Sequence, residues 1–349
     1  MVSPGLYFHH PTSLDHDPRE QLPEHPDSPE RIAMVDWAMA MEDWLGFELR
    51  TAGAPGDDAL LAVHSARLIE YLRELDSRGG GEIDAATFLG AASWPAALHA
   101  AGAACAMVRA LVAGESRTAF AGVRPGGHHA HRDRAAGFCL LNNVAIAAEL
   151  AISELGVGRV LVLDWDVHHG DGTAEIFRER DDVLVAGIHQ CGIYPGTGAG
   201  TGAGTLTDSG SGAGAGFTIN LPVPAGTDGH LWLSLLEHVA LPAAREFAPD
   251  LVLISAGFDA HRLDPVGGCR LETEDFAQMA CHVRDLAEDL GAPVGAVLEG
   301  GYHPEALAEC VVATLAALAG DGVSESIAPD QFYTPRAAAH IGHHWTLDF

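Results

Sequence analysis

The sequence predicts an α/β protein in which one mostly parallel β-sheet is flanked by helices on both faces. Short apolar runs alternate with amphipathic stretches from about residue 60 onward, the pattern of repeated β-α-β units. At 349 residues the chain is long enough for one large α/β domain. No stretch between the units has the composition of an interdomain linker. We therefore expect residues 1–349 to form a single domain.

Five short apolar runs are expected to be strands, because each is the length of a buried strand and is bounded by polar or glycine-rich segments. They lie at residues 118–123, 160–164, 183–188, 251–255 and 294–298. Helices are expected at 96–113, 143–155, 231–247, 273–289 and 304–319. Strand and helix thus alternate along most of the chain.

Three segments are expected to be irregular or peripheral. Residues 1–30 form an N-terminal loop segment, rich in Asp, Glu, His and Pro from residue 14, before a helix that begins at Arg31. Residues 196–216 consist mainly of Gly, Ala, Thr and Ser, which cannot build a core, so they predict a long surface loop. Residues 320–349 form a C-terminal extension.

The composition argues against several partners. A net charge of −29 argues against nucleic acid, whose binding depends on clustered Lys and Arg, and favours a cationic partner. The six cysteines form no CxxC pair, which suggests a reducing compartment, so a cytoplasmic protein is expected. The apolar stretch 96–114 is interrupted by His99, Gly102 and Arg109, and predicts a packed helix rather than a membrane span. A homo-oligomer is compatible with the sequence.

Polar residues follow four of the predicted strands. Because ligands of open parallel sheets bind outside the carboxyl ends of the strands, these segments are candidates for an active site. They contain His128 and His129, then Asp164 to Asp171, then Asp259, and finally Glu299 to Tyr302. Any one of these residues could be a helix cap or an ordinary buried side chain. Their accumulation at four strand ends favours a site.

Asp166, His168 and Asp259 are the candidate metal ligands. Asp164, Asp166 and His168 alternate, so in an extended chain they point to one side. Asp259, after another strand, can complete a set of three oxygen and nitrogen ligands, which leaves one position for water, as in a catalytic zinc site. Zn²⁺, Fe²⁺, Mn²⁺ and Co²⁺ all suit such ligands.

The remaining polar residues are candidates for proton transfer and charge stabilisation. His128 and His129 can exchange protons near pH 7. Asp164 and Asp171 can orient these imidazoles and raise their basicity. Tyr302, after a Gly-Gly pair, can donate its hydroxyl to a developing oxyanion. Together these groups suffice for amide hydrolysis.

Six motifs in order resemble the histone deacetylase family, and more closely its class II and bacterial histone-deacetylase-like amidohydrolase branch. The resemblance extends from Pro23 to about Leu318. The motifs are RPGGHHA (124–130), GFCLLNNVAIA (137–147), VLDWDVHHGDGT (162–173), YPGTG (194–198), SAGFD (255–259) and LEGGY (298–302).

The resemblance implies the arginase/deacetylase fold and a single zinc ion, bound by Asp166, His168 and Asp259, with Fe²⁺ or another divalent ion as an alternative. It also implies that His129, paired with Asp171, is the general base and acid, and that His128, paired with Asp164, supports the transition state. Tyr302 would polarise the carbonyl. A narrow channel for the acyl-lysine stem would be lined by Phe138, Gly137 and Tyr194.

The chain departs from the family pattern at three positions. Gly126 replaces a proline, and Tyr194 stands where Phe is common. Gly187 stands where many relatives have a serine that helps to bind a structural K⁺, so this ion, otherwise implied at backbone oxygens of the 164–168 segment, is less firmly expected.

The expected substrate is an acyl-lysine of a peptide or protein, and an acetylpolyamine or another N-acetylated metabolite is the alternative. Polyamine-selective members of the family carry a Glu at the channel rim where this chain has Val266. Two other readings remain. An arginase-like two-metal enzyme needs carboxylates that the segment before Asp259 lacks, and a silent acyl-lysine-binding module would be expected to have lost Tyr302 or a metal ligand.

Overall fold

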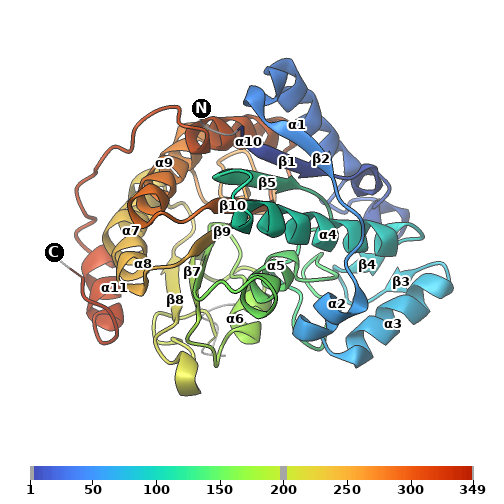
Figure 1. Ribbon diagram of the computed structural model, residues 1–349, viewed down its shortest axis with the longest axis horizontal. Coiled ribbons are helices and arrows are strands. Elements are labelled where there is room, and N and C mark those ends of the chain that lie inside the picture. The colour runs from blue at the N-terminus through green and yellow to red at the C-terminus, as the bar shows by residue number, and fades with distance from the viewer. Residues whose placement is uncertain (1–3, 197–202, 348–349) are drawn as a thin grey trace.

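The computed structural model describes residues 4–196 and 203–347. Within these residues, eight strands form one sheet in the order β2-β1-β5-β10-β9-β6-β7-β8, and every pairing is parallel (Figure 1). The strands are β1 (Leu6–His9), β2 (Glu48–Thr51), β5 (Thr118–Gly122), β6 (Val160–Asp164), β7 (Val183–Gln190), β8 (Thr218–Val223), β9 (Leu251–Ala256) and β10 (Val294–Leu298). The predicted α/β architecture is confirmed.

Helices cover both faces of the sheet (Figure 1). One apolar cluster packs under α1 (Pro29–Met41), α7 (Gly229–Leu235), α8 (Leu241–Phe247), α9 (Thr273–Leu290), α10 (Pro304–Leu318) and α11 (Tyr333–Ile341). A second cluster packs under α2 (Asp57–Val63), α3 (Ala66–Ser77), α4 (Ser93–Val112) and α5 (Asn143–Ser153). In β6, Leu161 and Leu163 belong to the first cluster and Val160 and Val162 to the second. Alternate side chains along a strand thus pack into the two apolar clusters on opposite faces of the sheet.

The five predicted strands are all present, with ends that differ by at most two residues. Five further strands were not predicted: β1, β2 and β8 of this sheet, and β3 (Gly81–Glu82) and β4 (Phe88–Leu89), which form a separate antiparallel pair. β1 and β2 have only four residues each, and the side chains of β2 are mostly exposed because it is an edge strand. β8, the opposite edge, contains Pro222. Short edge strands give little hydrophobic pattern, so their sequence signal is weak.

The helices predicted between the strands are also present, with one interruption. The predicted helix at 231–247 is divided into α7 and α8 by a π-helical turn, Leu236–Ala240. Pro242 lies in the first turn of α8 and lacks the N–H that a continuous α-helix would need there, which accounts for the wider turn. α4 is long and apolar enough to cross a membrane, but most of its residues are buried against β5 and α5, as in the core helix of a folded domain.

The segments predicted to be irregular contain more structure than expected. Residues 1–30 were predicted to be loop, yet β1 lies within the sheet, where it pairs with β2 and β5. The C-terminal extension contains α11, which packs on α7. Of the glycine-rich segment 196–216, residues 197–202 lie outside the described residues, and the described part contains a short 3₁₀ helix, Gly212–Gly214.

Candidate active site

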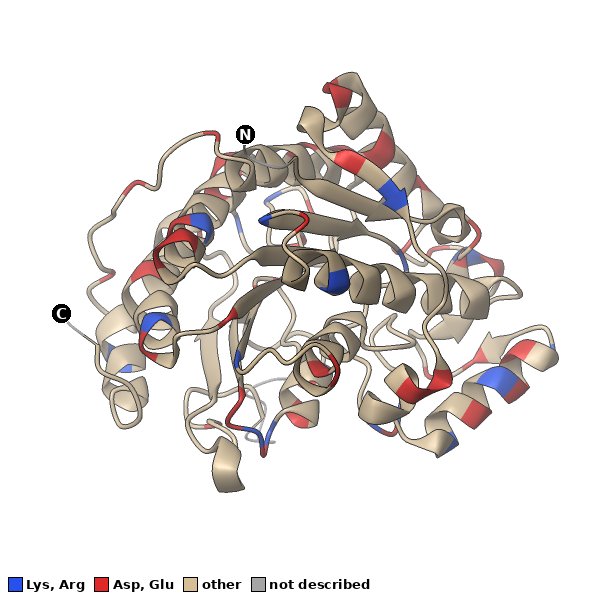
Figure 2. Ribbon diagram, viewed as in Figure 1, with Lys and Arg blue, Asp and Glu red and all other residues tan. Residues whose placement is uncertain are grey.

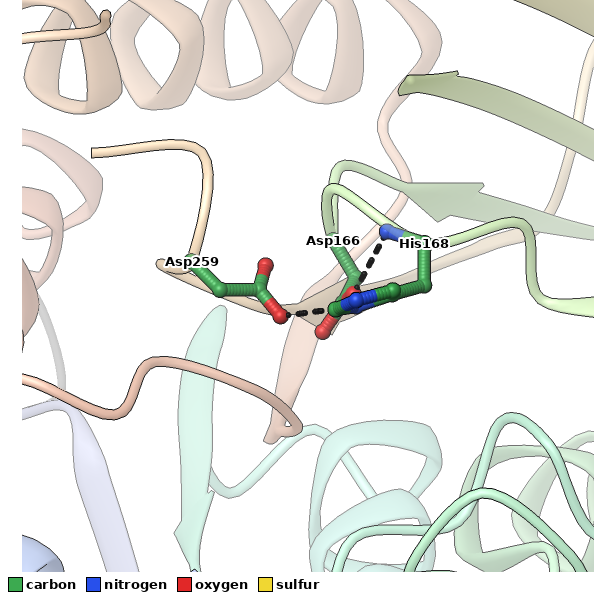
Figure 3. A group of neighbouring side chains, drawn as sticks. All are labelled: Asp166, His168 and Asp259. Atoms are coloured by element: carbon green, nitrogen blue, oxygen red, sulfur yellow. Dashed lines mark hydrogen bonds and ion pairs between the residues drawn. The ribbon is translucent and has the colours of Figure 1, made fainter. Parts of the chain in front are cut away.

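The three candidate metal ligands converge at the carboxyl edge of the sheet. Asp166 and His168 lie just after β6, and Asp259 follows β9, the neighbouring strand. Nδ1 of His168 lies 3.0 Å from Oδ1 of Asp166 and 3.0 Å from Oδ2 of Asp259 (Figure 3). All three side chains are buried. Within residues 4–196 and 203–347, this is the one group of three or more Asp, Glu, His or Cys whose ligand atoms lie within 4.8 Å of one another.

Two glycines leave room for these carboxylates. A Cβ atom at Gly257 would lie 2.1 Å from Oδ2 of Asp166, and one at Gly300 would lie 2.1 Å from Oδ2 of Asp259. The backbone N–H of Gly300 donates to Oδ2 of Asp166 at 2.8 Å. The glycines of the SAGFD and LEGGY motifs therefore form a cradle that any side chain would fill.

The charges of the cluster fit a cation. Burial and the negative charge of Asp166 raise the pKa of Asp259 to about 7. Burial alone would lower the pKa of His168, but the carboxylates of Asp259 and Asp166 outweigh it and raise that pKa to about 10. The cluster thus takes up protons because it has an excess of buried negative charge. A divalent ion coordinated by two oxygens and one nitrogen would compensate this charge, so these residues fit a metal site.

His128 and His129 lie side by side next to this cluster, and each is bound to a different carboxylate. Nδ1 of His128 lies 2.9 Å from Oδ2 of Asp164, and Nδ1 of His129 lies 2.7 Å from Oδ1 of Asp171. The two ring centres are 4.0 Å apart. In both cases Nε2 is left for the site, because the carboxylate occupies Nδ1.

The two histidines differ in their preferred protonation state. For His128, burial favours the neutral form, but Asp166 and Asp164 outweigh it and raise the pKa well above its ordinary value. For His129, burial and the neighbouring His128 lower the pKa to about 3, although Asp171 acts in the opposite direction. His129 is therefore neutral near pH 7, with a free nitrogen that can accept a proton.

A buried carboxylate fixes the loop that carries both histidines. Oε2 of Glu299, at the end of β10, accepts the backbone N–H groups of Gly127 at 2.6 Å and of His128 at 3.2 Å. Oε1 accepts the hydroxyl of Ser255 at 3.3 Å. Glu299 thus ties the 127–129 loop to β9 and β10.

Aromatic side chains surround the approach to the histidines. The ring of Tyr194 lies edge-on to His129 with centroids 4.8 Å apart, and Phe138 lies edge-on to Tyr302 at 5.6 Å. Gly137 lies between them: a Cβ atom there would be 2.4 Å from Cδ2 of His129 and 2.7 Å from Cε1 of Tyr194. Tyr194 remains 41% exposed, so this wall borders solvent.

Tyr302 and Val266 are linked through Asp264. Oδ2 of Asp264 accepts the backbone N–H of Tyr302 at 2.6 Å, and Oδ1 accepts the N–H groups of Val266 at 2.8 Å and Gly267 at 3.1 Å. Burial raises the pKa of the Tyr302 phenol, and the negative charges of Asp259 and Asp166 raise it further. The hydroxyl therefore stays protonated, as a hydrogen-bond donor must be.

Twelve residues were predicted for the site. Eleven of them lie together in the structure, where they contact one another directly or follow the same strand end. The twelfth, Val266, is hydrogen-bonded to Asp264, which also binds the backbone of Tyr302. Glu299, Asp264 and His131 have contacts in the site that were not predicted from the sequence. Glu299 lies within the LEGGY motif, so its position next to Gly300 was the one available signal.

The family model of the histone deacetylase domain matches residues 25–318, which is most of the chain. The chain is 38% identical over 274 residues to the histone deacetylase-like amidohydrolase of Pseudomonas aeruginosa, covering 78% of this chain and 71% of that protein. It is 39% identical over 278 residues to the human polyamine deacetylase HDAC10, covering 78% of this chain and 41% of that protein.

A solved structure shows the same architecture. The crystal structure of the HDA15 HD domain superposes with a TM-score of 0.90 and 30% sequence identity, covering 99% of this chain and 96% of that one. The fold is consistent with the arginase/deacetylase α/β architecture that the motifs implied. The chain therefore belongs to the histone deacetylase family and is a hydrolytic deacetylase.

Proposed function

We propose that this protein is a zinc-dependent deacylase that hydrolyses the acyl amide of acyl-lysine side chains in peptides or proteins. The observation that carries the proposal is the combination of a three-ligand group, Asp166, His168 and Asp259, with two imidazoles and a phenol at the same sheet edge. Amide hydrolysis needs an activated water, a base and a donor for the oxyanion, and these residues supply all three.

Asp166, His168 and Asp259 would hold a divalent ion, which would supply Lewis acidity for the acyl carbonyl and for a water near pH 7. His129 takes the proton from the attacking water at Nε2 and delivers it to the leaving amine, since Nδ1 is bound to Asp171. His128, which carries positive charge next to Asp164, stabilises the negative charge of the transition state.

Tyr302 donates its hydroxyl to the carbonyl oxygen as negative charge develops there. The backbone hydrogen bond to Asp264 fixes the tyrosine, and Phe138 packs against its ring. Phe138, Gly137 and Tyr194 would then enclose the apolar stem of the substrate amine, for which flat aromatic faces are suited.

Zinc is proposed because a buried set of two carboxylate oxygens and one imidazole nitrogen suits it, with one ion per chain, and Fe²⁺ is the second choice. A structural K⁺ bound by backbone oxygens of the 164–168 segment, and a cytoplasmic location, also remain predictions.

The acidic surface supports a cationic substrate. Figure 2 shows Asp and Glu spread over the outer helices and loops, with far fewer Lys and Arg. This matches the net charge of −29 and provides a field that attracts lysine-rich peptides or polyamines and repels nucleic acids.

The alternative substrate is an acetylated polyamine, because one relative is named as a polyamine deacetylase. Val266, which is uncharged, favours the acyl-lysine substrate. A neutral side chain at the rim offers no attraction for the second ammonium group of a polyamine.

The proposal is tested with a panel of substrates. The protein is loaded with Zn²⁺ or Fe²⁺, and kcat/KM is measured for acetyl-lysine peptides, longer acyl-lysine peptides and acetylspermidine. We expect hydrolysis of acyl-lysine peptides, with the highest kcat/KM in the panel. A preference for acetylspermidine would favour the alternative, and no hydrolysis of any amide with either metal would refute both.

A further inference from the structure

His131 joins the candidate active site to the molecular surface through Asp171. Its Nε2 lies 3.0 Å from Oδ2 of Asp171, and its Nδ1 is hydrogen-bonded to Glu175. The residue is only 5% exposed, whereas nearly half of the Glu175 side chain is accessible to solvent. The imidazole thus bridges one carboxylate that faces the site and another that faces solvent.

The local backbone explains this arrangement. Asp171 and Glu175 are four residues apart on α6 (Asp171–Ile176), so their carboxylates project from the same side of the helix. The backbone N–H of His131 donates to the carbonyl of Arg134 at 2.8 Å, and Nδ1 of His64 lies 2.9 Å from the carbonyl of His131. Hydrogen bonds to its N–H and to its carbonyl therefore fix the backbone of His131, and with it the position of the imidazole.

Asp171 consequently has an imidazole on each of its oxygens. Oδ1 is 2.7 Å from Nδ1 of His129, and Oδ2 is 3.0 Å from Nε2 of His131. A carboxylate with a single partner can rotate about its terminal bond, whereas one that is bound at both oxygens has a fixed plane. The plane of Asp171 in turn determines where Nε2 of His129 points.

The elements that pack against His131 place charged and titratable groups around its ring. Asp171 and Glu175 come from α6, and the mostly exposed Arg134 comes from the same loop, with Nη2 2.6 Å from Nε2 of the ring. A hollow of about 320 Å³ next to the ring is lined by His169, Arg178 and Asp208 among others. His64 contacts the carbonyl side.

Among these groups the two carboxylates decide the charge of the ring. Burial alone would lower the pKa of His131, but the hydrogen bonds to Asp171 and Glu175 outweigh it and raise the pKa to about 9. Arg134 lies on the solvent side of this group, with 64% of its side chain accessible and Nη2 3.8 Å from Oδ2 of Asp171. The two carboxylates therefore favour the imidazolium at neutral pH, in which Nδ1 donates to Glu175 and Nε2 donates to Asp171.

We propose that His131 is a positioning residue for the hydrolysis: as an imidazolium it holds the second oxygen of Asp171, which fixes the orientation of His129 and limits its basicity. The inference rests on the proposed function, in which His129 moves the protons. With Asp171 partly neutralised, His129 is a weaker base that releases its proton readily to the leaving amine.

Two substitutions separate the hydrogen bond from the charge. His131→Gln keeps a donor at the position of Nε2 without the charge, and His131→Ala removes both. We expect kcat of His131→Gln to stay within about threefold of wild type, and kcat of His131→Ala to fall by about tenfold, with KM little changed in either. In both variants the acid limb of the kcat/KM profile should move upward by about half a pH unit or more, because loss of the positive charge raises the pKa of His129.

The matched control is His282→Gln, which alters a buried histidine of α9 that is bonded to the carbonyl of Glu325. Its pH profile should coincide with that of the wild type. An acid limb that does not move in His131→Gln, in a protein with wild-type melting temperature, would contradict the proposal, as would wild-type kcat in His131→Ala.

A spectroscopic measurement tests the charge without any substrate. Imidazole ¹⁵N shifts of the wild type, with His131 assigned by its loss in His131→Gln, should show both nitrogens protonated at pH 7. In Asp171→Asn the titration of His131 should move to lower pH, while His64 stays neutral down to about pH 5. A neutral His131 at pH 7 would overturn the inference. If the wild type hydrolyses no amide, the proposed function fails, and the spectra still decide the charge of His131.

Discussion

The backbone N–H of Gly300 donates to Oδ2 of Asp166 at 2.8 Å and joins the end of β10 to the loop after β6. The Cα atom of Gly300 also faces the carboxylates of both candidate ligands, Asp166 and Asp259. A Cβ atom there would lie 2.1 Å from Oδ2 of Asp259 and 2.5 Å from Oδ2 of Asp166. This hydrogen bond and the spacing of the two ligands therefore depend on the absence of a side chain at residue 300.

Gly300→Ala should weaken metal binding, because the added methyl group must displace one of the two carboxylates. We expect the zinc content after dialysis against a weak chelator to fall by about half or more, with a tenfold loss of metal affinity as the order of magnitude. Gly53→Ala is the control, since a Cβ atom at Gly53 would have no neighbour within 4 Å. Full zinc retention by Gly300→Ala would show that the cradle is not needed.

Asp259→Ala should lose most of the bound metal as well as the activity. The variant leaves two ligands and removes one of the two buried carboxylates that offset the charge of the ion. Elemental analysis should give close to one ion per chain for the wild type and far less for the variant. Asp57→Ala, at an exposed position on α2, should bind metal normally. Two tightly bound transition-metal ions in the wild type would refute the single-site assignment.

Tyr302→Phe should lower kcat by roughly a hundredfold or more and leave the metal content unchanged, because the phenol acts on charge that develops only in the transition state. The burial that raises the pKa of Tyr302 keeps the hydroxyl protonated across the working range. Steady-state kinetics together with elemental analysis checks both parts. Tyr71→Phe, at an exposed position, serves as the control. An unchanged kcat would mean that another donor serves the oxyanion.

Val266→Glu should shift the substrate preference toward polyamines. Val266 lies on the turn that Asp264 connects to Tyr302, so a carboxylate there would face the distant ammonium group of a bound polyamine. We expect kcat/KM for acetylspermidine to rise by about tenfold, the effect of one partly screened ion pair of about 1.4 kcal/mol. Val266→Gln, similar in size but neutral, is the control. No difference between the two variants would place specificity elsewhere.

The stability of the fold should decrease in mild acid because of His64. This side chain is fully buried: Nδ1 donates to the carbonyl of His131 and Nε2 accepts the N–H of Asn142, so the ring is held neutral. Burial lowers its pKa to about 4, below the ordinary value of 6.5. The unfolded chain therefore binds a proton first as the pH falls, and stability that is complete above pH 6.5 is lost between pH 6.5 and 4.

The loss from His64 should reach about 3 kcal/mol at pH 4, since each pKa unit corresponds to about 1.4 kcal/mol. Urea unfolding of the wild type and of His64→Gln, measured from pH 7 to pH 4.5, gives the difference. The free energy of unfolding of the variant should be lower at pH 7 but should decline less steeply with pH. Parallel declines would assign the acid sensitivity to other groups.

The central part of the fold could be predicted from the sequence because buried parallel strands are continuous apolar runs. β6, β9 and β10 lie in the middle of the sheet and were predicted almost to the residue. β2 and β8 are the two edges, where one side of the strand has no partner, and the selection for apolar residues is weaker. β1 is too short to give a pattern, although both of its sides are paired.

The residues of the candidate site that directly follow strands could be predicted from the sequence. Contacts between different loops at the sheet edge could not. Asp166, His168 and Asp259 could be proposed as ligands because polar side chains interrupt apolar runs at the strand ends. Nothing in the local sequence of Asp264 indicates that its carboxylate holds Tyr302, 38 residues away. The motifs identified the residues, and the neighbours that orient them became apparent only in the structure.

The local order of apolar, polar and glycine residues specifies which elements form and which residue types collect at the carboxyl edge of the sheet. The tertiary structure decided which oxygen of which carboxylate each imidazole meets. Asp171 binds His129 and His131 at opposite oxygens since α6 and the 127–131 loop are packed against each other at one angle. Such pairings depend on the packing of segments about forty residues apart, and no local pattern in the sequence encodes that angle.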